Sequence, residues 1–128
     1  MKTIIRTSLL ALALAGCSTI QAAIGVVTGT TVTPGAAVIA ANAFDAVEAT
    51  GTVYLQLPTC PTATPICKSQ SAVNAIVPAI RTGRTARNAL EGAVMAANGS
   101  PVSATLLSAL QAQTSTLQAI YANYKIGQ

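Results

Sequence analysis

The chain has 128 residues, which is enough for one small domain and too few for two. Hydrophobic residues make up 52% of it, but three Tyr, one Phe and no Trp provide too few aromatic side chains for a typical β-sandwich. The formal net charge is +4. Without Lys2 and Arg6, which lie within the first six residues, five basic and three acidic residues leave a net charge of +2. That charge is too small to predict nucleic-acid binding.

The N-terminus has the parts of a secretory signal. Two basic residues precede an apolar run from Leu9 to Ala15. The run is shorter than the roughly 20 residues that a membrane-spanning helix needs. It ends in Leu14-Ala15-Gly16-Cys17, which resembles the lipobox of bacterial lipoproteins, in which an apolar and two small residues precede the modified cysteine.

This resemblance covers residues 1–18 and implies the following processing. Residues 1–16 would be removed as a signal peptide, and Cys17 would carry a diacylglyceryl group and further acylation. In lipoproteins that this sequence resembles, a serine directly after the modified cysteine, as at Ser18, favours transport to the outer membrane of a Gram-negative host. The alternative is ordinary cleavage after Ala13-Leu14-Ala15, which would release a soluble periplasmic protein.

A tether and a first helix follow. Residues 17–33 lack charge and contain two glycines, so we expect a lipid-anchored tether, in which a short strand through Val26–Val32 has no obvious partner. The first helix is predicted at about 35–57, because Thr33 can cap it and Pro34 suits its first position. Its predicted apolar face consists of Ala36, Ile39, Ala43, Ala46, Thr50, Val53 and Leu57, widened by Phe44, Val47 and Tyr54. Gly51 predicts a close helix contact.

Three prolines in residues 58–67 predict a loop, after which two further helices are expected. The second, at about 69–98, contains Pro78, where we expect a kink or a break. Its predicted face consists of Val73, Ile76, Val77, Ile80, Gly83, Leu90 and Val94. The third, at about 101–125, should be capped by Ser100 with Pro101 at its first position. Its predicted face consists of Ser103, Leu106, Leu110, Gln113, Leu117, Ile120 and Tyr124.

These elements predict an all-α domain over residues 34–128, a small antiparallel three-helix bundle. The alternative is a two-helix hairpin whose third helix docks on a partner. Cys60 and Cys67 lie in the loop between the first two helices. Because the periplasm is oxidising, they predict a structural disulfide. Closing a loop of about eight residues would add roughly 2.5 kcal/mol of stability. A redox pair or a metal site is the alternative, although no His is present to complete a zinc site.

Arg81, Arg84 and Arg87 recur every third residue on the second helix. They could bind an anionic partner such as lipid headgroups or cell-wall polymer. The interpretation we favour is ion pairing, for example of Arg87 with Asp45 or Glu48 across the first two helices or with Glu91 one turn later.

The sequence does not predict an enzyme. It has no His, three acidic residues, and none of the nucleophile-elbow, phosphate-loop or metal-ligand motifs, so no metal or cofactor is expected. A carboxylate pair at Asp45 and Glu48 is the one weak catalytic hypothesis. We therefore expect a non-enzymatic outer-membrane lipoprotein that binds envelope components: another envelope protein, itself, peptidoglycan or anionic lipid. A phage-type lipoprotein for lysis or superinfection exclusion shares only its size and anchor.

Overall fold

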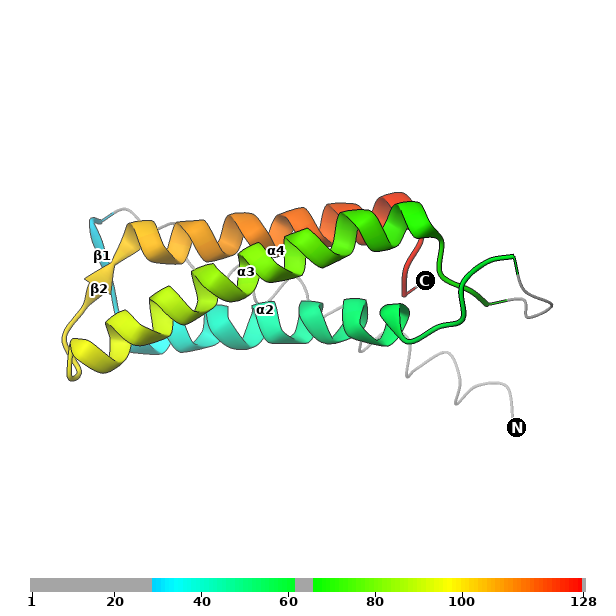
Figure 1. Ribbon diagram of the computed structural model, residues 1–128. Helices are drawn as coiled ribbons and strands as arrows, with labels where there is room; N and C mark the ends of the chain where they lie inside the picture. Colours follow the sequence, from blue (N-terminus) through cyan, green and yellow to red (C-terminus); the bar gives the residue numbers. More distant parts are fainter. Residues whose placement is uncertain (1–28, 62–65, 128) are drawn as a thin grey trace, which may run out of the picture.

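The computed structural model of the chain describes residues 29–61 and 66–127. The predicted signal peptide, the lipobox and Cys17 lie outside these residues. Within them, the elements are β1 (Thr31–Val32), α2 (Pro34–Leu55), α3 (Gln70–Ala96), β2 (Val102–Ser103) and α4 (Ala104–Tyr124). The three helices lie lengthwise beside one another, each contacts the other two, and consecutive helices run in opposite directions (Figure 1). The predicted three-helix bundle is confirmed.

Helix α2 begins as the sequence predicts. The Thr33 side chain accepts a hydrogen bond from the Ala36 N–H at 3.3 Å, and Pro34 occupies the first helical position. Proline has no N–H and its φ already suits a helix, so this position does not penalise it. The helix ends at Leu55, two residues before the expected end.

Helix α3 runs through Pro78 without interruption, so this proline does not break the helix. The Ser69 side chain caps its start by accepting from the Ala72 N–H at 3.2 Å. After the last helical residue, Ala96, the chain turns through Asn98 and Gly99, both with positive φ. Glycine adopts this conformation without steric penalty, and asparagine tolerates it better than most residues.

The predicted start of the third helix is wrong by three residues. Ser103 caps α4, by accepting from the Thr105 N–H at 3.2 Å, and Ser100 does not. The reason is a short antiparallel pairing of β1 with β2, in which Val32 lies opposite Val102. Both valines are buried, so residue 102 contributes to the core as a strand residue rather than as the first turn of a helix. Figure 1 shows β1 and β2 together at one end of the bundle.

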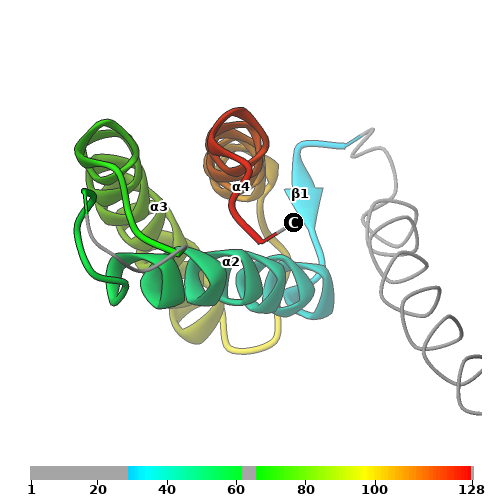
Figure 2. The same ribbon diagram turned by 90° about the vertical axis from the view of Figure 1, so that its right-hand side faces the viewer.

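Residues 31–32 lie in the range predicted as a tether, so folded structure begins before residue 34. The Ala104 N–H also donates to the Thr30 carbonyl at 3.0 Å. We call this end of the bundle the β end: it comprises β1, β2, the first turns of α2 and α4 and the last turns of α3. The opposite end, with the Cys60–Cys67 loop and the C-terminus, is the disulfide end (Figures 1 and 2).

The core consists of aliphatic side chains and two aromatic ones, Phe44 and Tyr121. The largest fully buried side chains are Phe44, Ile76, Leu90, Leu107, Leu110 and Leu117. On α2 the predicted face is confirmed at Phe44, which is buried, and at Val47 and Tyr54, which are partly buried. It is wrong at Ile39 and Val53, which are exposed, and the remaining buried positions are Ala37, Ala40, Ala41 and Gly51. On α4 the buried positions Ala104, Leu107 and Tyr121 each lie one residue after a predicted one, while Leu110 and Leu117 are as predicted. On α3, Ile76, Ile80, Gly83 and Leu90 are buried as expected, whereas the predicted Val77 is exposed.

Two glycines set how closely the helices approach. A Cβ atom at Gly83 would lie 2.2 Å from Cε2 of the buried Phe44 ring. One at Gly51 would lie 2.3 Å from the Tyr121 hydroxyl oxygen and 3.1 Å from Cδ1 of Ile80. The close helix contact predicted at Gly51 is confirmed. At both positions an aromatic side chain occupies the space that any other residue would fill.

Replacing Gly83 with Ala should lower the free energy of unfolding by about 1–3 kcal/mol, because the added methyl group would displace Phe44 from a closed core. The matched control is Gly92→Ala, on the same helix, where nothing lies within 4 Å of the added Cβ. There, alanine should raise stability by up to about 1 kcal/mol through helix propensity. Urea denaturation followed by circular dichroism measures both. Equal effects of the two substitutions would contradict the packing described here.

The Tyr121 hydroxyl makes the free energy of unfolding depend on pH. It donates to the Val47 carbonyl at 2.9 Å, and burial raises its pKa above the ordinary 10.0. A raised pKa in the folded state means that this stability is complete below pH 10 and is lost as the pH rises through the folded-state pKa. Tyr121→Phe should cost about 1 kcal/mol at pH 7 through the lost hydrogen bond. It should also lose less stability than the wild type between pH 9 and 11.

Both proteins share every other titrating group, so the difference between their two pH profiles isolates Tyr121. Parallel alkaline profiles, measured by urea denaturation at each pH, would show that the hydroxyl ionises as easily in the folded chain as in the unfolded one.

Candidate functional sites

The acidic residues and two of the three predicted arginines meet on one face, between α2 and α3. Arg87 holds Asp45 with two hydrogen bonds, from Nε to Oδ1 at 2.6 Å and from Nη2 to Oδ2 at 2.8 Å. Its Nη1 reaches Oε2 of Glu91 at 2.6 Å, one turn along α3. Arg84 pairs with Glu48, with Nε 2.8 Å from Oε1. The ion pair expected between Arg87 and Asp45 is confirmed.

These contacts stabilise the charged forms of the two arginines. Hydrogen bonding to Glu48, helped by its negative charge, raises the pKa of Arg84. The hydrogen bonds to Asp45 do the same for the pKa of Arg87, against a smaller opposing effect of burial. Arg81 is exposed and forms no ion pair among residues 29–61 and 66–127. The three arginines therefore do not form one open anion site: an anion at Arg84 or Arg87 would have to compete with a carboxylate that is already bound there.

The same contacts bear on the hypothesis of a catalytic carboxylate pair. Asp45 and Glu48 lie one helical turn apart, but each accepts hydrogen bonds from a guanidinium group. In the described part of the chain, no three His, Cys, Asp or Glu side chains are placed to hold a metal ion. This arrangement suits a structural contact between two helices.

The coupling between Arg87 and Asp45 can be measured with a double-mutant cycle of Arg87→Gln and Asp45→Asn. Both side chains are partly exposed, so we expect a coupling energy of up to about 1 kcal/mol, which decreases with added salt. Arg81→Gln is the matched control and should change stability by less than about 0.5 kcal/mol. A coupling energy of zero would mean that the pair contributes nothing to folding.

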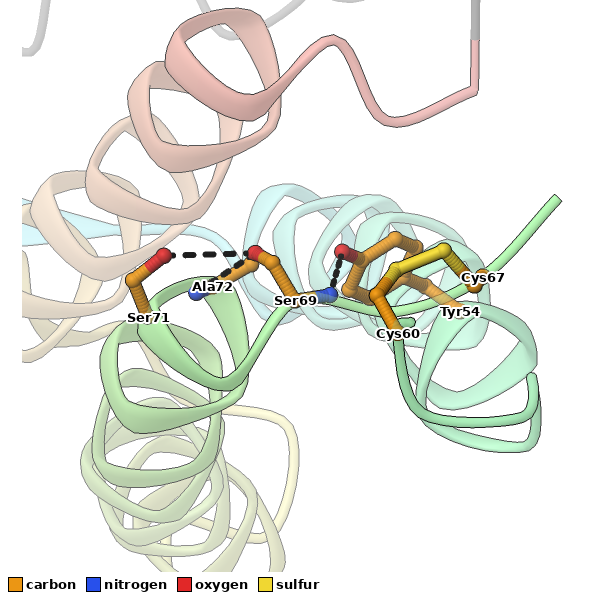
Figure 3. Close-up of a disulfide and its surroundings, with 6 residues drawn as sticks. All are labelled: Tyr54, Cys60, Cys67, Ser69, Ser71 and Ala72. Carbon is orange, nitrogen blue, oxygen red and sulfur yellow. Dashed lines mark hydrogen bonds between the residues drawn. A yellow bond between two sulfur atoms is a disulfide. The ribbon is translucent and has the colours of Figure 1, made fainter. Parts of the chain in front are cut away.

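At the disulfide end, Cys60 and Cys67 form the predicted disulfide, with their Cα atoms 5.3 Å apart. Backbone hydrogen bonds hold the two sides of the loop together, from Cys60 N–H to the Lys68 carbonyl and from Lys68 N–H to the Pro58 carbonyl. The Tyr54 hydroxyl accepts from the Ser69 N–H at 2.9 Å and joins the end of α2 to the start of α3 (Figure 3).

Lys68 makes a further contact here, which the sequence does not predict. The Lys68 ammonium donates to the Leu55 carbonyl, at the C-terminus of α2. A cation at this position satisfies a free carbonyl and the negative end of the helix dipole. No pattern in the sequence separates Lys68 from an ordinary surface lysine, because its partner is a backbone atom.

At the β end, a shallow groove of about 220 Å³ lies between the start of α2 and the end of α3. It is lined by Ala37, Val38, Leu90, Glu91, Val94 and Met95. The side chains of Val38 and Met95 are 51% and 75% exposed. One feature of the sequence could have indicated this groove, namely that residues 29–44 and 92–124 contain no Asp, Glu, Lys or Arg.

Comparison with family models, with curated proteins and with solved structures found no significant match. No helix among the residues described is both long and apolar enough to cross a membrane.

Proposed function

We propose that this protein is a lipid-anchored, non-enzymatic component of the bacterial envelope, held at the periplasmic face of the outer membrane. The observation that carries the proposal is the sequence Leu14-Ala15-Gly16-Cys17 at the end of a short apolar run. Ser18, after the cysteine, favours the outer membrane. The Cys60–Cys67 disulfide supports an oxidising compartment such as the periplasm.

The surface of the bundle supports a role in binding rather than in catalysis. The carboxylates of Asp45, Glu48 and Glu91 all contact arginines. The outward positions of α4 instead present small polar and apolar side chains without charge: Thr105, Ser108, Ala109, Ala112, Ser115, Thr116, Gln118, Ala119, Ala122 and Asn123. Such a face can pack closely on another helix, and we propose that it binds an envelope protein or a second copy of this chain.

The anchor is tested by the intact mass of the protein extracted from cell membranes. We expect the mass of residues 17–128 plus a diacylglyceryl group, with or without a third acyl chain, and a gain of about two daltons when the disulfide is reduced. A Cys17→Ala variant is the control and should leave the membrane fraction. A lipid-free mass would contradict the proposal and identify a soluble periplasmic protein.

The binding face is tested separately, by site-specific photocrosslinking in intact cells. A crosslinker at Ser108, Ser115 or Ala119 on α4 should give a discrete adduct. The same crosslinker at the exposed Asn88 or Ala89 on α3 is the control. Equal labelling from both helices, or no adduct from α4, would rule out α4 as the binding face.

A further inference from the structure

The β end of the bundle and the outer face of α4 have almost no charge, whereas the charged side chains of the described residues lie on α2, on α3 and near the disulfide end. Every Asp, Glu, Lys and Arg of the described residues lies within residues 45–91 or at Lys125. Only Glu91 borders the groove at the β end, and its carboxylate is hydrogen-bonded to Arg87 at 2.6 Å. The polar groups at this end are small hydroxyls and amides, such as Thr31, Ser100 and Asn98.

Three of the six exposed large apolar side chains of the described residues lie at the same end, and the other three, Val53, Ile66 and Val77, lie nearer the disulfide end. Val38, Ile39 and Met95, which we call the apolar patch, are 51%, 44% and 75% exposed. Val38 and Met95 line the groove from opposite sides, one from the first turns of α2 and the other from the last turn of α3. In water these side chains cost free energy, and any apolar surface that covers them would recover it.

The chain enters the fold at this end, because β1 precedes α2 there (Figure 1). If Cys17 carries lipid, as the proposed function holds, only residues 18–28 separate the bilayer from Gly29. Eleven residues span at most about 40 Å, so the bilayer is always within reach of the β end. At so high an effective concentration, a small apolar patch needs little affinity of its own to stay bound.

We propose that the apolar patch docks on the bilayer that holds the Cys17 lipid. In this arrangement Val38 and Met95 enter the boundary between headgroups and acyl chains, and the disulfide end points away from the membrane. The β end can approach the bilayer with little cost of desolvating charge, because the one charged residue that borders its groove, Glu91, is hydrogen-bonded to Arg87. The surface around Asp45 and Glu48 carries more charge. The lipid supplies the attachment and the patch supplies the orientation. This inference rests on the proposed lipid anchor.

The protein contains no tryptophan, so a single introduced indole reports on one position without background. The full-length lipidated protein, with Met95→Trp or Val38→Trp, is reconstituted in phospholipid vesicles whose acyl chains carry bromine. The matched control is Val53→Trp, since Val53 is also highly exposed, at 63%, but lies near the disulfide end. Circular dichroism verifies that each variant is folded.

The expected result is a blue shift and loss of most fluorescence for tryptophan at 95 and 38, and neither change at 53. Equal quenching at 95 and 53 would overturn the inference while leaving the lipid anchor intact. The inference would also be overturned if tryptophan at 95 were quenched neither by the brominated lipid nor by acrylamide in the water. In that case a protein partner or a second copy of the chain would cover the patch. Intact mass of the same samples separates the two proposals: protein without lipid refutes the anchor and the docking together.

Discussion

The structure depends on the contact of the Phe44 ring with the backbone of α3 at Gly83. Phe44 is the only phenylalanine in the chain and is completely buried. Its ring occupies the volume of the missing side chain, so α2 and α3 approach each other as closely as a ring against a backbone allows. Tyr121 uses Gly51 in the same way between α4 and α2. Alanines at 37, 40 and 41 then suffice to fill the narrow space along α2.

This close packing explains which features of the fold could be predicted from the sequence and which could not. The Thr33-Pro34 helix start, the loop between the cysteines and the contact at Gly51 were predictable, because each depends on local stereochemistry or on one unusual residue. Most of the buried face of α2 was not. Periodicity favours large apolar side chains, so it selected Ile39 and Val53, whereas the short distance between the helices admits alanine and glycine and leaves those larger residues outside.

The ion pairs, the strand pairing and the groove can also be divided into features that the sequence predicts and features that it does not. Pairing of Arg87 with Asp45 could be anticipated, because a chain with three acids leaves its arginines few partners. The β1–β2 pairing could not, since Thr31 and Val102 are far apart in sequence and two-residue strands carry almost no periodic signal. The groove at the β end was likewise missed, although the absence of charge around it is visible in the sequence. Uncharged residues form no pattern typical of a catalytic or metal-binding site, and at the β end they form the surface that we propose faces the membrane.

The β1–β2 pairing also decides how mechanical load enters the bundle. A pull on the chain ahead of Gly29 reaches β1 before it reaches α2. Part of the force then passes sideways, through the ladder to β2 and through the Thr30 carbonyl to the Ala104 N–H, into the start of α4. Two helices that run in the same direction, α2 and α4, thus share the tension at their N-terminal ends. Unravelling of α2 from its start under such a pull would therefore also require these contacts with β2 and α4 to break.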